Sequence, residues 1–222
     1  MALTLRASGV YCGAHLNSAD DLIPAEFLYD ACRVMSRHVQ CHGAYQWNFE
    51  KVLSAEIDRC FVALLELYLK SVLDNKARYR GWKLPETVLL FPWLVRLLPQ
   101  MKFIYWVRDP RDAVLDRHRT DDLRRFNIPI TQARDPVEMR AASWKYQYDI
   151  VKATPKPPNF LLVKFEDFVL DQDRQLTKLE DFLGLQLVRI PVDRGRVGMW
   201  RNHKNRREFS FLQPALHDLG YE

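Results

Sequence analysis

The chain has 222 residues, a length that fits one domain. Hydrophobic residues make up 48% and aromatic residues 12%, which is enough for a large core and too much for a disordered chain. The net charge of +5 favours anionic partners; phosphate ligands, nucleic acid and acidic substrates are all compatible with it.

The sequence also argues against membrane spans, secretion and metal binding. The apolar runs 61–69 and 88–99 are interrupted by charged residues or proline, so neither should span a bilayer. The first residues lack the basic start and apolar core of a secretory signal, and we expect a cytoplasmic protein with reduced cysteines. The group His38, Cys41 and His42 lacks a second ligand pair at zinc spacing, so we expect no metal site.

Apolar residues recur at helical spacing through most of the chain. The expected helices cover residues 24–40, 48–74, 86–98, 110–126, 136–153 and 173–183, with a short one inside 211–221. Gly184 is expected to end the helix before it, because glycine readily takes the left-handed conformation of a helix C-terminus.

Three short segments are expected to be strands: "GWKL" at 81–84, "FIYWV" at 103–107 and "FLLVKF" at 160–165. The segment "FIYWV" is an unbroken apolar run, typical of a strand buried on both faces, and "FLLVKF" is expected to be a second buried strand. Because helices separate them, we predict an α/β fold with a parallel sheet flanked by helices. Ligands of such sheets bind at the carboxyl ends of the strands, and Arg108 follows the strand 103–107 directly.

The segment "VRDPRD" permits two interpretations. Arg108 and Arg111 lie at a strand end and a helix start, where free N–H groups and guanidinium forks suit a phosphate. Alternatively, Asp109 and Asp112 simply pair with the arginines and cap the helix. Spacing alone does not choose between them.

A late segment, "RGRVGMWRNHKNRR" at 194–207, is strongly basic and contains no acidic residue. It can be a solvated loop, a nucleic-acid-binding patch, or a loop whose glycines let the backbone approach a ligand closely. Its basic residues are Arg194, Arg196, Arg201, Lys204, Arg206 and Arg207.

Taken together, "GWKLPET", "FIYWVRDPRDAV", "FLLVKFEDFVLDQDRQLTKLEDFLGL" and "GRVGMWRN" resemble, in order and spacing, the sulfotransferases that use 3′-phosphoadenosine 5′-phosphosulfate. The resemblance covers about residues 80–221. It implies a P-loop-like parallel sheet, the nucleotide as co-substrate, a hydroxyl or amine acceptor and no metal. In such a reaction the protein positions the reactants and stabilises the charge on the leaving phosphate.

The resemblance also assigns roles to individual residues. Lys83 would lie near the transferring group, and Glu86 is a candidate base. Arg108 would bind the 3′-phosphate of the donor, and the late loop would close on the same phosphate. The residues of that loop with an implied binding role are Arg194, Gly195, Arg196, Gly198 and Trp200.

Two departures from the family pattern stand out. Asp116 occupies the position where a serine usually binds the 3′-phosphate; it can face away, belong to a shifted alignment, or weaken the site. The stretch 1–17 resembles the family's segment just after the phosphosulfate-binding loop, so we expect the single domain 1–222 to be N-terminally incomplete. The alternatives are an inactive or truncated member that binds adenosine 3′,5′-bisphosphate, and a basic nucleic-acid-binding protein.

Overall fold

The structure is a computed structural model that describes residues 1–43, 45–130, 133–204 and 207–221. Its helices and strands in chain order, with η marking 3₁₀ helices, are α1 (Ala2–Ala7), α2 (Glu26–Ser36), β1 (Gln40–Gly43), β2 (Gln46–Asn48), α3 (Glu50–Ser54), α4 (Arg59–Leu73), η1 (Pro85–Leu90), α5 (Phe91–Leu97), β3 (Phe103–Val107), α6 (Pro110–Ala113), η2 (Arg119–Asp121), η3 (Leu123–Phe126), α7 (Pro136–Ala153), β4 (Phe160–Lys164), α8 (Phe165–Leu170), α9 (Gln172–Leu183), η4 (Arg194–Arg196), η5 (Met199–Asn202), η6 (Ser210–Leu212) and α10 (Gln213–Leu219).

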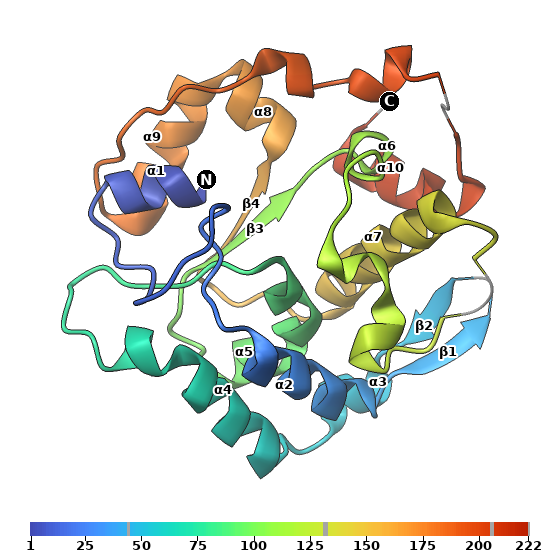
Figure 1. The fold of residues 1–222 in the computed structure, drawn as a ribbon, viewed down its shortest axis with the longest axis horizontal. Helices are drawn as coiled ribbons and strands as arrows, with labels where there is room; N and C mark the ends of the chain where they lie inside the picture. Colours follow the sequence, from blue (N-terminus) through green and yellow to red (C-terminus); the bar gives the residue numbers. More distant parts are fainter. Residues whose placement is uncertain (44, 131–132, 205–206, 222) are drawn as a thin grey trace.

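A parallel pair of strands, β3 and β4, runs through the middle of the molecule (Figure 1). The pairing starts at Phe103 opposite Phe160 and ends at Val107 opposite Lys164. The connection between the two strands includes α6 and α7. This pairing confirms the predicted parallel sheet and both predicted strands, but β4 is not buried on both faces, because Leu162 is exposed.

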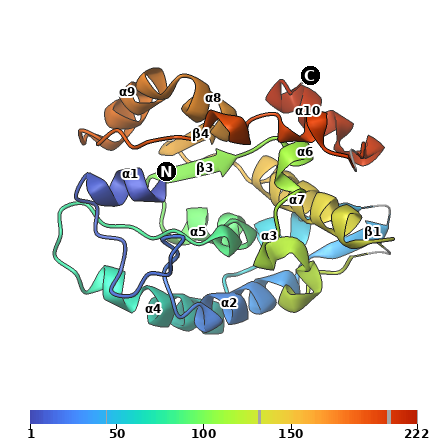
Figure 2. The ribbon, with the colours of Figure 1, turned by 45° about the horizontal axis from the view of Figure 1, so that its top comes forward.

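Helices cover both faces of this strand pair (Figure 2). Side chains of a strand point alternately to opposite faces, so the residues of β3 divide between two clusters. Ile104 and Trp106 pack with Phe168 and Leu179 of α8 and α9. Phe103 and Tyr105 belong to the main core, which includes residues of α2, α4, α5 and α7. The unbroken apolar run is therefore explained by burial on two sides.

The predicted helices at 24–40, 136–153 and 173–183 are confirmed with small boundary shifts. Asp135 caps α7 by accepting hydrogen bonds from the backbone N–H groups of Val137 and Glu138. Gly184 ends α9 in the left-handed conformation, with φ of 68°. The stretch 48–74 forms two helices, because Asp58 starts α4 as an N-cap that accepts from the Cys60 N–H.

The prediction of a strand at 81–84 is wrong. Strand pairing here is limited to an isolated parallel bridge between Tyr11 and Arg80, with two backbone hydrogen bonds that involve Tyr79 and Gly81. The chain then turns into η1 at Pro85, since proline fits the first turn of a helix.

The predicted helix at 110–126 is also wrong beyond its first turn. Only α6 is α-helical, and η2 and η3 follow as separate turns. Two aspartates here bond to nearby backbone instead of leaving it to a helix: Asp121 accepts from the His118 N–H and Asp122 from the Arg124 N–H. Such local bonds compete with helix hydrogen bonds.

The late loop is fixed to the start of α6 by one buried carboxylate. Asp112 is fully buried and accepts hydrogen bonds from the N–H groups of Gly198 at 2.7 Å and Trp200 at 2.8 Å. Gly198 has a φ of 74°, a conformation that favours glycine. The Arg111 guanidinium lies 4.0 Å from the centroid of the Trp200 ring. Asp112 therefore sets where the loop lies relative to the end of β3.

None of the helices in the described ranges is long and apolar enough to cross a bilayer.

We predict that Asp112→Ala lowers the free energy of unfolding by about 2–4 kcal/mol, because two backbone N–H groups lose their acceptor in a largely buried place. Asp74→Ala is the matched control, since Asp74 forms an exposed pair with Lys70 that should contribute at most about 1 kcal/mol. Urea unfolding of both variants measures the difference. Equal losses in the two variants would show that Asp112 does not anchor the loop.

Candidate functional site

Arg108 lies at the carboxyl end of β3 and is held on several sides. Its backbone carbonyl accepts a hydrogen bond from the indole N–H of Trp144 at 3.0 Å. Its guanidinium stands 4.9 Å from the ring centroid of Phe165, the first residue of α8 after the neighbouring strand β4. The two strand ends and α7 thus position one cation at the edge where parallel sheets bind ligands.

A second arginine and a carboxylate meet Arg108 there. The Asp116 Oδ2 atom accepts from Arg108 Nη1 at 2.9 Å and from Arg196 Nη2 at 2.8 Å. Arg108 Nη2 also donates to the carbonyl oxygen of Arg196 at 2.9 Å. We call Arg108, Asp116 and Arg196 the arginine cluster. It joins the strand end, the bend after α6 and the late loop.

The arginine cluster keeps an excess of positive charge. Two guanidinium groups share one carboxylate, so the cluster carries one net positive charge at neutral pH. The Nε atom of Arg108 is buried and has no hydrogen-bond partner among the described residues. A buried N–H without a partner is unusual and points to a missing acceptor. A guanidinium offers planar paired donors that suit phosphate, sulfate or carboxylate oxygens.

The structural interpretation of "VRDPRD" holds for Asp109 but not for Asp112, and the phosphate-binding interpretation stays a prediction. Asp109 pairs with Arg111 at 2.7 Å and caps α6, as the structural interpretation expects. Asp112 binds the late loop instead of an arginine. Arg108 pairs with neither Asp109 nor Asp112, and its guanidinium belongs to the arginine cluster.

The other late-loop residues have separate contacts. Arg194 donates to the carbonyl of Leu170, and the Gly195 N–H donates to Asp193. Trp200 is buried against Arg111. Of the predicted site residues in the described part of the loop, Arg196 is the one hydrogen-bonded to Arg108. Arg206 lies outside the described residues.

One part of this region was missed from the sequence. Glu166, after β4, accepts from the backbone N–H of Asp109 at 2.9 Å and from the Tyr221 hydroxyl at 2.7 Å. It links the end of the chain to the turn that follows Arg108. The sequence could have indicated this residue, because Glu166 directly follows a predicted strand and so lies at the same sheet edge as Arg108.

Lys83 forms a different group near the start of the chain. Its ammonium lies 2.5 Å from an Asp21 carboxylate oxygen and 3.1 Å from the Ala19 carbonyl oxygen. Its side chain remains partly exposed. Within the described residues, no hydrogen bond or ion pair joins Lys83 to Arg108.

Glu86 is almost completely buried, with 2% of its surface exposed. Burial is the main cause that raises its pKa above the ordinary value, and nearby Asp21 adds to the rise; its own backbone N–H, Arg119 and Lys83 oppose it. Its Oε2 atom has no hydrogen-bond partner among the described residues. Glu86 is therefore a carboxyl group that holds its proton more firmly than usual.

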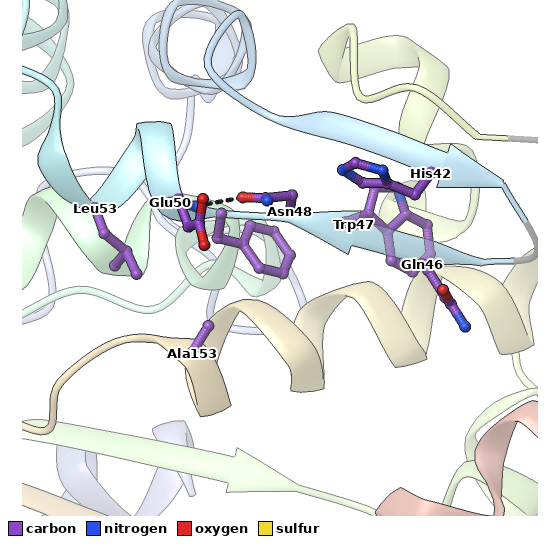
Figure 3. A pocket seen from close by; sticks show the side chains of 8 residues that line it. His42, Gln46, Trp47, Asn48, Glu50, Leu53 and Ala153 are labelled. Atoms are coloured by element: carbon purple, nitrogen blue, oxygen red, sulfur yellow. Dashed lines mark hydrogen bonds between the residues drawn. The ribbon is translucent and has the colours of Figure 1, made fainter.

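Two hollows of the described surface are lined by residues outside the arginine cluster. A hollow of about 380 Å³ lies between the β1–β2 hairpin, α3 and the end of α7, and is lined by His42, Trp47 and Glu50 among others (Figure 3). A smaller one of about 210 Å³ borders α6 and α10, with Arg111 and Tyr221 in its wall. Within the described ranges, no group of three or more His, Cys, Asp or Glu residues could hold a metal ion.

We predict that Glu86→Gln stabilises the protein by about 1–3 kcal/mol at pH 7, because the wild type must ionise a buried, partly unsatisfied carboxyl group there. The folded state binds the proton more tightly than the unfolded state, so wild-type stability falls as pH rises above the ordinary glutamate pKa near 4.5. The advantage of the glutamine variant should vanish below that pH.

Thermal unfolding of both proteins between pH 4 and pH 8 measures this difference. A glutamine variant that is no more stable than wild type at pH 7, or an advantage independent of pH, would show that Glu86 is satisfied in its ionised form.

Comparisons with known proteins agree with this architecture. The family model described as "Sulfotransferase family" matches residues 7–189, well over half of the chain. The arginine at the end of β3 lies inside this match and the late loop lies outside it. No curated protein matches the sequence significantly.

A solved structure described as "Sulfotransferase Domain from the Curacin Biosynthetic Pathway" superimposes with a TM-score of 0.52 at 15% sequence identity. The alignment covers 73% of this chain and 68% of that one, and at this identity it supports the fold alone. With the parallel strand pair and the match over residues 7–189, the chain belongs to the sulfotransferase family.

Proposed function

We propose that the protein transfers a sulfuryl group from 3′-phosphoadenosine 5′-phosphosulfate to a hydroxyl or amine acceptor, and that the arginine cluster binds the 3′-phosphate of this donor. The observation that carries the proposal is the buried, unpartnered Nε atom of Arg108 beside a second arginine at the sheet edge. A 3′-phosphate offers an oxygen acceptor of the kind that Arg108 Nε lacks among the described residues.

The residues of the chain would contribute in three ways. Arg108 and Arg196 would fix the nucleotide by its 3′-phosphate and so hold the reacting end at one distance from the sheet. Lys83 would place a positive charge where the leaving group gains negative charge. Glu86 would accept the acceptor's proton, and the property that supports this role is its raised pKa, which makes it a stronger base than an ordinary glutamate. The donor itself supplies the sulfuryl group and a phosphate leaving group.

Contacts within the late loop favour this proposal over nucleic-acid binding. Arg194, Arg196 and Arg207 are engaged with Leu170, Asp116 and Asp135. Nucleic-acid binding depends on the number of phosphates that the protein cations neutralise, and the pairing of Arg196 and Arg207 with aspartates lowers the charge that the loop offers.

We predict that adenosine 3′,5′-bisphosphate stabilises the protein more than AMP does at equal concentration. Ligand at about a hundred times its dissociation constant should add roughly 2.7 kcal/mol to the free energy of unfolding. Thermal-shift titration with the two nucleotides compares them directly. Equal shifts with the two nucleotides would show that the 3′-phosphate does not bind to the arginine cluster.

We predict that Arg108→Ala weakens binding of the bisphosphate by about 1.5–3 kcal/mol, the range for hydrogen bonds to charged groups. Arg189→Ala is the matched control, because Arg189 also pairs with an aspartate, Asp173, at an exposed position outside the arginine cluster. Calorimetric titration of both variants provides the measurement. An Arg108→Ala variant that binds normally, or that no longer folds, would identify Arg108 as a structural residue.

A further inference from the structure

Asp116 occupies the place of an anion between the two arginines. A single oxygen, Oδ2, accepts from both guanidiniums. A carboxylate offers these donors what a phosphate oxygen would offer, namely a negatively charged acceptor at hydrogen-bond distance. The arginine cluster thus contains its own anion.

The chemistry of Asp116 is opposed to that of a serine. A hydroxyl group can donate a hydrogen bond to a phosphate oxygen, whereas an ionised carboxylate only accepts. A phosphate that binds Arg108 and Arg196 while Asp116 stays in place would meet a like charge on the same two cations. The repulsion between charges at such distances is substantial even near a protein surface.

The position of Asp116 lets its side chain leave the arginines. The residue lies in the bend after α6 and outside the regular helix. Its side chain is 32% exposed, compared with 16% for Arg108. A rotation toward solvent would release Arg108 Nη1 and Arg196 Nη2 without breaking a helix.

We propose that Asp116 is an internal competitor of the 3′-phosphate and so determines how strongly the site prefers nucleotides that carry one. The carboxylate must be displaced before the phosphate binds, which weakens the 3′-phosphate contact and leaves the rest of the nucleotide unaffected. This inference rests on the proposed function, because it concerns the same two arginines.

The test compares two probes that differ only in where the phosphate is attached, adenosine 3′-monophosphate and adenosine 5′-monophosphate. Calorimetric titrations use the wild type, Asp116→Asn, Asp116→Ser and Arg108→Ala. Asp173→Asn is the matched control, because it removes one carboxylate from an exposed arginine pair elsewhere.

Both Asp116 variants should bind the 3′-monophosphate at least tenfold more tightly than the wild type, about 1.4 kcal/mol at 25 °C. Their affinity for the 5′-monophosphate should change by less than about twofold, and Asp173→Asn should behave as the wild type with both probes. A merely structural ion pair would change stability without changing this selectivity.

Two results overturn the inference and separate it from the proposed function. If Asp116→Asn and Asp116→Ser bind the 3′-monophosphate no better than wild type, or fail to fold, while Arg108→Ala weakens binding, Asp116 is no competitor and the proposed site stands. If Arg108→Ala leaves binding of the 3′-monophosphate unchanged, the proposed site falls and the inference falls with it.

Discussion

A buried carboxylate fixes the geometry on which the rest of the site depends. Asp112 accepts hydrogen bonds from two backbone N–H groups of the late loop, across 86 and 88 residues of sequence. It stands four residues after Arg108, on a helix that begins where β3 has just ended. The strand therefore positions Arg108, and Asp112 brings Arg196 to it. The contacts of both guanidiniums with Asp116, and of Arg108 with the Arg196 carbonyl, complete this arrangement.

The arginine cluster then follows from charge balance. Two cations placed together at a strand end repel each other, and Asp116 reduces that repulsion by pairing with both. The pairing is incomplete, because Arg108 keeps a buried N–H without an acceptor in the described part of the chain. A site with a partial internal anion can be stable when empty and still bind an external phosphate. The partial neutralisation of the two arginines by Asp116 would therefore set the affinity of the site for the 3′-phosphate.

The sequence predicted those features that depend on short-range patterns. The apolar run 103–107 predicted β3 because burial on two faces leaves no polar alternation, and helical spacing predicted α7 at 136–153. The prediction of a helix at 110–126 was wrong, because aspartates in this stretch accept hydrogen bonds from the local backbone. The sequence placed Arg108 at the sheet edge, but it could not choose the orientation of Asp116 or find the partners of Asp112, since those contacts join distant segments.

The most direct measurement of the proposed site is an experimental structure of the protein with adenosine 3′,5′-bisphosphate. We predict that the 3′-phosphate lies within hydrogen-bond distance of Arg108 and Arg196, that Arg108 Nε donates to it, and that the Asp116 carboxylate has moved away from both arginines. A bisphosphate bound elsewhere, with the contacts of Asp116 to Arg108 and Arg196 intact, would contradict the assignment of this edge of the sheet as the nucleotide site.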